Sequence, residues 1–135
     1  MSTVSYTMLN NKNELSYTGD KIRADAFYGN TDGLHTVSVK FDDFVGRLFI
    51  EGTLASDPNE TTDWFPIYLT SGSSYKQYPV NSAAPTGNVG DTGTDGFTFR
   101  INVIFLRARI DRDFLNASAY DLTQHGRIDQ ILLNV

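Results

Sequence analysis

Alternation of apolar and polar side chains with a period of two residues runs through most of this chain and restricts it to β structure. In residues 34–41 the apolar Val37, Val39 and Phe41 alternate with polar neighbours, as expected for a strand with one buried face. No window of helical length shows a clear 3.6-residue repeat of apolar residues. We therefore expect a chain built almost entirely from strands.

Two segments shift the phase of this alternation. In residues 97–110 the apolar side chains occupy odd positions as far as Phe105 and even positions from Leu106 onward. One extra residue in a strand turns every later side chain over, which predicts a bulge or corner between Ile104 and Leu106. Residues 126–135 slip phase once as well, and we expect them to form a packed strand.

The spacing of the expected strands indicates the fold class. Weaker strands are expected at residues 14–18 and 21–28, a further strand at residues 46–54, and turn-forming residues separate the strands at short intervals. Such spacing is typical of a sandwich or jelly roll. The length of 135 residues corresponds to about one domain. We expect residues 1–135 to form a single all-β domain, a jelly-roll-like sandwich of two antiparallel sheets.

Residues 70–96 differ from the rest, because Ser, Gly, Thr, Asn and Pro dominate them. A loop of this length inside a compact domain is uncommon and is usually either functional or disordered. The sequence predicts one long inserted loop here, and it leaves open whether this loop is a contact-making arm or a flexible insertion.

Composition argues against several classes of function. The net charge is −5 with no run of basic residues, so nucleic-acid binding is not expected. No segment resembles a signal peptide or a membrane span. The absence of cysteine excludes disulfides and zinc–thiolate sites. We expect no cofactor.

Candidate catalytic and metal-binding residues are few. Neither His35 nor His125 has an evident nucleophile and orienting group in the sequence, so structural roles are expected. Turn carboxylates could bind calcium or, if two of them converged, hydrolyse a glycosidic bond. Solvated turn residues are the stronger interpretation, since Asp is favoured in turns by its own backbone hydrogen bonds. The carboxylates in question are Asp42, Asp43, Asp57, Glu60, Asp63, Asp111 and Asp113.

Aromatic residues are the candidate contact residues. Phe49 interrupts the polar face of residues 46–54, which indicates a strand covered on both sides or bordering an interface. Trp64, the sole tryptophan, follows an acidic loop; it either plugs one end of the sandwich or forms a platform for a sugar ring. With Tyr75 and Tyr78 of the expected loop, Phe49 and Trp64 form a candidate protein interface. The alternative is a glycan site made of Trp64, Tyr75, Tyr78 and Asp63.

Three stretches together resemble small β-sandwich modules in structural proteins of tailed bacteriophages, notably contractile-tailed phages of aquatic bacteria. They are residues 46–54 with the following Asp57-Pro58 and Asp63-Trp64-Phe65, residues 105–110, and residues 126–133. The resemblance spans residues 34–135, and the 70–96 segment departs from its compact form.

The resemblance implies a virion structural protein of the tail, baseplate, fibre attachment or capsid surface, made in the host cytoplasm. Such a protein would not be an enzyme, and its partners would be other virion proteins and further copies of itself. A carbohydrate-binding module for host surface glycan is the alternative.

Overall fold

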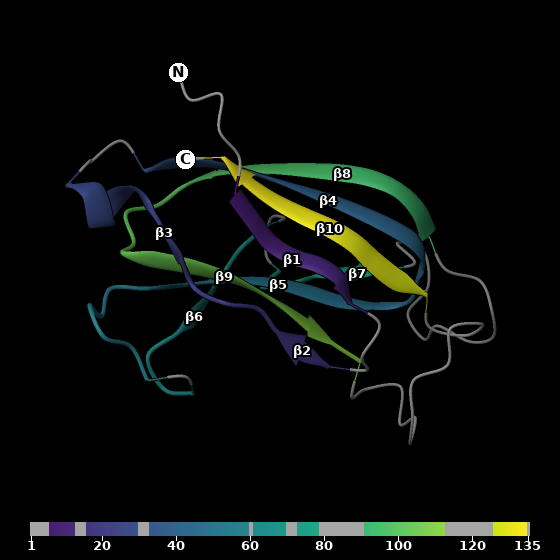
Figure 1. Cartoon of the computed structure of the whole chain (residues 1–135), viewed down its shortest axis with the longest axis horizontal. Helices are drawn as coiled ribbons and strands as arrows, with labels where there is room; N and C mark the ends of the chain where they lie inside the picture. Colours follow the sequence, from purple (N-terminus) through teal and green to yellow (C-terminus); the bar gives the residue numbers. More distant parts are fainter. Residues whose placement is uncertain are drawn as a thin grey trace.

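The computed structural model describes residues 6–12, 16–29, 33–59, 61–69, 73–78, 91–112 and 126–134. Within these ranges the elements are almost all strands, and the one helical element is the 3-10 turn η1 (Asp25–Tyr28) (Figure 1). The strands are β1 (Tyr6–Lys12), β2 (Tyr17–Thr18), β3 (Ile22–Arg23), β4 (Leu34–Phe44), β5 (Gly46–Thr53), β6 (Phe65–Ile67), β7 (Lys76–Tyr78), β8 (Asp91–Arg100), β9 (Phe105–Asp111) and β10 (Arg127–Asn134).

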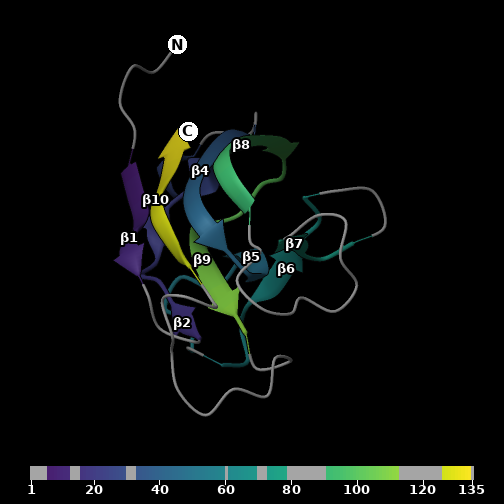
Figure 2. The ribbon, with the colours of Figure 1, turned by 90° about the vertical axis from the view of Figure 1, so that its right-hand side faces the viewer.

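The strands form two antiparallel sheets that pack face to face. A four-stranded sheet has the order β1-β10-β4-β8. A six-stranded sheet has the order β2-β9-β5-β6, with β3 also paired to β9 and β7 also paired to β5. Figure 2 shows the two layers side by side. The expected all-β sandwich of two antiparallel sheets is confirmed.

The order of the strands is that of a jelly roll. β2 and β3 pair with successive parts of β9, and β6 and β7 pair with different parts of β5, so each pair acts as one interrupted strand. The described strands then reduce to eight, which can be lettered B to I along the chain. The sheets read B-I-D-G and C-H-E-F, the order in which two Greek keys form a jelly roll.

The core lies between the sheets and follows the period-two pattern. Val37, Val39 and Phe41 of β4 are buried, as the sequence predicts, and they face Leu48 and Ile50 of β5 across the core. Burying these side chains is the main source of stability for a fold of this kind, at about 25 cal/mol for each Å² of apolar surface removed from water. The remaining core residues include Leu106, Ala108, Ile110, Ile128, Ile131 and Leu133.

The phase shift expected between Ile104 and Leu106 is a corner between the sheets. Residues 101–104 leave the four-stranded sheet at the end of β8 and enter the six-stranded sheet at β9. Ile104 N donates a hydrogen bond to Thr53 O at 2.8 Å, and Ala24 N donates one to Ile104 O at 2.8 Å. Residues 97–110 therefore belong to two strands in different sheets. The side chains that face the core change from odd to even positions where the chain passes from one sheet to the other.

The phase slip near the C-terminus is a bulge in β10. The pairing of β10 with β4 shifts register between Ile128 and Gln130. Ile128 and Ile131 can both face the core because of that shift. β1 has a similar irregularity between Thr7 and Leu9 in its pairing with β10.

Two expectations about local structure are wrong. Residues 21–28 are not one strand, because the chain leaves β3 after Arg23 and turns as η1. The loop expected at residues 70–96 contains β7 and the first half of β8. Among the described strands β8 pairs with β4 alone, and its Thr92, Thr94 and Gly96 are exposed. Because these residues are polar or small, the sequence did not indicate a strand. Residues 79–90 lie outside the described part.

Candidate functional site

The side of the six-stranded sheet that points away from the core carries a dense set of polar and aromatic side chains. Three cross-strand pairs place these residues opposite one another: Arg47 faces Asp111, Phe49 faces Arg109 and Glu51 faces Arg107. Their neighbours along each strand, such as Leu48, point into the core. These six residues define what we call the β5–β9 outer face.

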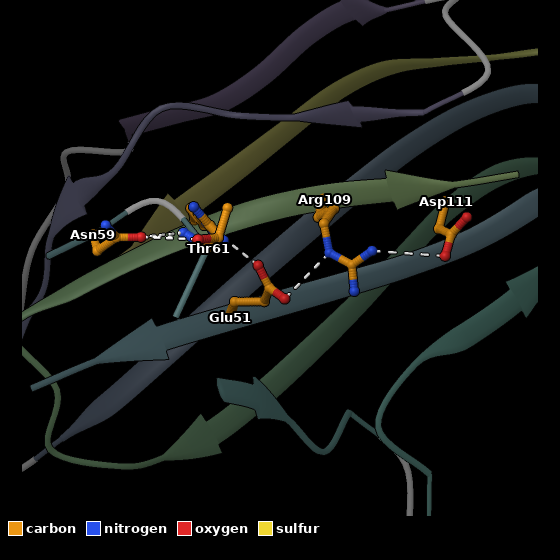
Figure 3. A network of polar contacts seen from close by, with 6 residues as sticks. Glu51, Asn59, Thr61, Arg109 and Asp111 are labelled. Carbon is orange, nitrogen blue, oxygen red and sulfur yellow. Dashed lines mark hydrogen bonds and ion pairs between the residues drawn. The ribbon is translucent and has the colours of Figure 1, made fainter. Parts of the chain in front are cut away.

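Glu51 is the centre of the charge network on this face. Its side chain is only 9% exposed, and its Oε1 accepts a hydrogen bond of 2.9 Å from Arg107 Nε. Its Oε2 accepts one of 3.2 Å from Arg109 Nε, and Arg109 Nη1 lies 3.6 Å from Asp111 Oδ2. Figure 3 shows Glu51, Arg109 and Asp111 in one chain of polar contacts. A buried carboxylate with both oxygens engaged holds its arginines in a fixed geometry.

Each arginine of this face lies over an aromatic ring. Arg109 lies 4.0 Å from the ring centroid of Phe49, and Arg107 lies 4.2 Å from that of Trp64. Arg47 lies 4.7 Å from the ring of Tyr75, which in turn packs on Phe49 at 5.5 Å. Stacking of a guanidinium on a ring contributes about 0.5–2 kcal/mol, depending on desolvation. The face is therefore a rigid surface in which arginines alternate with rings.

The structure brings together three of the four aromatic residues that the sequence indicates as an interface. Phe49, Trp64 and Tyr75 all contact the β5–β9 outer face and are half-buried. The prediction that Tyr78 is an interface residue is wrong, because Tyr78 is fully buried between the sheets. Its ring packs on Phe41 at 4.4 Å, and its hydroxyl donates to Asp95 Oδ2 at 2.7 Å. Tyr78 is a core residue and cannot contact a partner in this conformation.

A surface pocket of about 540 Å³ opens beside Trp64. One wall is the segment between β2 and β3, which contributes Asp20 and Lys21. The opposite wall is the loop between β5 and β6, which contributes Thr61 and Trp64, and Arg107 of β9 also lines the pocket. The volume lies within the range of about 300–1,000 Å³ that is common for small-molecule sites.

Asp63 does not line this pocket and instead organises the loop between β5 and β6. Asp63 Oδ2 accepts a hydrogen bond of 2.6 Å from Asn59 N, and Asn59 Oδ1 accepts bonds of 2.9 Å from both Thr61 N and Thr61 Oγ1. Figure 3 shows the contact between Asn59 and Thr61. Of the residues expected in a glycan site, Trp64 alone lines the pocket; Tyr75 contacts Arg47 instead.

Among the described residues, the histidine and carboxylate candidates lie on β4, in the loop between β5 and β6, and at the end of β9. His35 is fully buried, its Nδ1 lies 2.8 Å from Gly33 O, and its ring stacks on Phe99, which agrees with a structural role. Asp42 lies 3.8 Å from Arg127. Within the described ranges no three His, Asp or Glu side chains gather in a way that could hold a metal ion. Glu60, Asp113 and His125 lie outside those ranges.

The central residues of the site, Glu51, Arg107 and Arg109, did not emerge from the sequence. They occupy the polar positions of strands with ordinary period-two alternation. Side chains at such positions are usually exposed to solvent, so nothing marked these three as a site. The one available signal was Phe49, an apolar residue among those positions.

No family model, no curated protein and no solved structure matches this chain. Among the described residues, no helix has the length and hydropathy needed to cross a membrane.

Proposed function

We propose that this chain is a structural protein of a tailed-phage virion that acts by binding other virion proteins through its β5–β9 outer face. It would belong to the tail, baseplate, fibre attachment or capsid surface and would be present in several copies. Assembly of this kind requires shape and rigid side chains, and no activated nucleophile or base.

The observation that carries the proposal is the arrangement of arginines and rings around Glu51. Protein interfaces are enriched in Arg, Tyr, Trp and Phe, and a few such residues usually supply most of the binding energy. Arg109 on Phe49 and Arg107 on Trp64 are held by a buried carboxylate before any partner arrives. Because these side chains are already ordered, binding costs less conformational entropy.

The strand order gives further support of a general kind. Jelly rolls occur in viral capsid proteins, and also in lectins and cupins. Since one fold serves many functions, this similarity of architecture is weaker support than the composition of the β5–β9 outer face.

The distribution of charge indicates the kind of partner surface. The chain has a net charge of −5, yet the β5–β9 outer face combines three arginines with Glu51 and Asp111. Complementary charge mainly sets specificity and the rate of association. We expect the partner to present acidic and aromatic or aliphatic groups to this face.

Mass spectrometry of particles made from the genome that encodes the chain tests the proposal. Particles purified through two density gradients should contain the chain at a fixed molar ratio to the major tail or capsid subunit. A chain that is abundant in the infected cell but absent from such particles would refute the proposal.

A further inference from the structure

We propose that the pocket beside Trp64 binds one or a few rings of a saccharide. This inference goes beyond the proposed assembly function and does not depend on it. It rests on the geometry of Arg107, on the mixture of polar groups around the pocket, and on how the pocket walls are fixed.

Arg107 is one of the two cationic residues in the described ranges that line the pocket. Its side chain is 91% buried, being 9% exposed, and its Nε is engaged by Glu51. Among the described residues its terminal nitrogens have no hydrogen-bond or ion-pair partner, although the side chain lines the pocket. A guanidinium has five N–H donors in a planar fork. A buried cation with donors to spare is stabilised by a ligand that carries acceptor oxygens.

The other polar groups of the pocket define the ligand class. Asp20 supplies carboxylate acceptors, Lys21 supplies an ammonium donor, and Thr18 and Thr61 supply hydroxyls. A sugar hydroxyl donates and accepts at once, so it can satisfy both kinds of group. A simple anion would meet the carboxylate of Asp20, and an apolar ligand would leave the terminal donors of Arg107 unsatisfied. Hydroxyl-rich saccharides therefore fit the pocket best.

The pocket is also preformed on the side of Asp20 and Lys21. Gly19 N donates a hydrogen bond of 2.8 Å to Ala108 O in β9. A Cβ at Gly19 would lie 2.7 Å from Met8 O, so only glycine allows this close approach. On the opposite side, the ring of Trp64 is held by the guanidinium of Arg107 at 4.2 Å. Ligand binding therefore requires little ordering of the walls.

A glycan array of neutral and acidic saccharides, followed by titration of the best ligand, tests this site in the full chain. Because Trp64 is the sole tryptophan, its fluorescence reports binding at the pocket directly. We expect a saccharide to bind and to change the Trp64 emission. Asp20→Asn and Arg107→Lys should each weaken binding about tenfold or more, since each removes hydrogen bonds made by a charged group.

Asp57→Asn is the matched control, because Asp57 is exposed in the facing loop and does not line the pocket. It should leave binding unchanged. Asp20 is exposed, so Asp20→Asn keeps the test valid if Arg107→Lys fails to fold.

Three results would overturn the inference. They are the absence of any saccharide binding at millimolar concentration, binding that Asp20→Asn leaves intact, and binding of an acidic peptide or inorganic phosphate with no saccharide bound. Presence of the chain in virions bears on none of these results, so the two proposals fail separately.

Discussion

Glu51 of β5 lies directly opposite Arg107 of β9, and its Oε1 accepts a hydrogen bond of 2.9 Å from Arg107 Nε in a largely buried position. The same carboxylate holds Arg109 through its other oxygen. One acidic side chain therefore orders two arginines, and through them the rings of Trp64 and Phe49.

Substitution Glu51→Gln should lower the free energy of unfolding by about 2–4 kcal/mol, because it removes the charge that compensates a buried guanidinium. Urea denaturation followed by circular dichroism measures the loss. Asp129→Asn is the control: Asp129 contacts Arg127 at 2.6 Å, but both side chains are considerably more exposed. That variant should lose less than about 1 kcal/mol. Equal losses would contradict a central role for Glu51.

The two tyrosines at residues 75 and 78 should differ sharply in their effect on stability. Tyr78→Ala leaves a cavity between the sheets and should cost about 3–5 kcal/mol. Tyr75→Ala removes a half-buried ring on the β5–β9 outer face and should cost about 1 kcal/mol. The midpoints of thermal unfolding of both variants, measured in the same buffer, test this prediction. A reversed order would show that the sheets are packed differently.

Gly19→Ala should destabilise the fold by about 1–3 kcal/mol, because the new methyl group meets two backbone oxygens, Met8 O and Ala108 O at 2.7 and 3.2 Å. Gly96→Ala is the matched control, since the nearest atom to its Cβ would be Val37 O at 4.0 Å. We expect Gly96→Ala to change the midpoint of urea denaturation very little. If Gly19→Ala were equally harmless, the segment would not approach β9 as closely as described.

Phe49→Ala should reduce incorporation of the chain into particles at least about tenfold, since loss of a central aromatic side chain commonly costs 2 kcal/mol or more in binding. Quantitative mass spectrometry of purified particles measures the incorporated fraction. Lys40→Ala, on the exposed side of the four-stranded sheet, should be incorporated normally. The thermal midpoints of both variants must be compared with the unsubstituted chain, so that misfolding is not mistaken for loss of binding.

Much of the sandwich follows from the sequence, because burial on one face of a strand imposes a period of two. Val37, Val39 and Phe41, and likewise Leu106, Ala108 and Ile110, are buried as their alternation predicts. The two shifts in the phase of the alternation also correspond to structural features. The shift after Phe105 marks the corner between the sheets, and the slip after Ile128 marks a bulge.

Edge strands and the contact site were harder to predict, and the reasons are physical. Among the described strands β8 pairs with β4 alone, and Thr94 and Gly96 lie on its exposed face, so its first half resembles a loop in sequence. Tyr78 lies in a polar stretch of sequence, yet tertiary packing buries it. The Glu51 network joins β5 to β9 across 56 residues of sequence, and such a pairing depends on strand register, which a single sequence does not reveal.

The most direct test of the assembly proposal is a cryo-electron microscopy reconstruction of the particle at a resolution that traces this chain. We predict that Phe49, Arg47 and Arg109 of the β5–β9 outer face lie against a neighbouring subunit in every copy. A particle in which that face is exposed to solvent while the chain is attached through the four-stranded sheet would contradict the proposal.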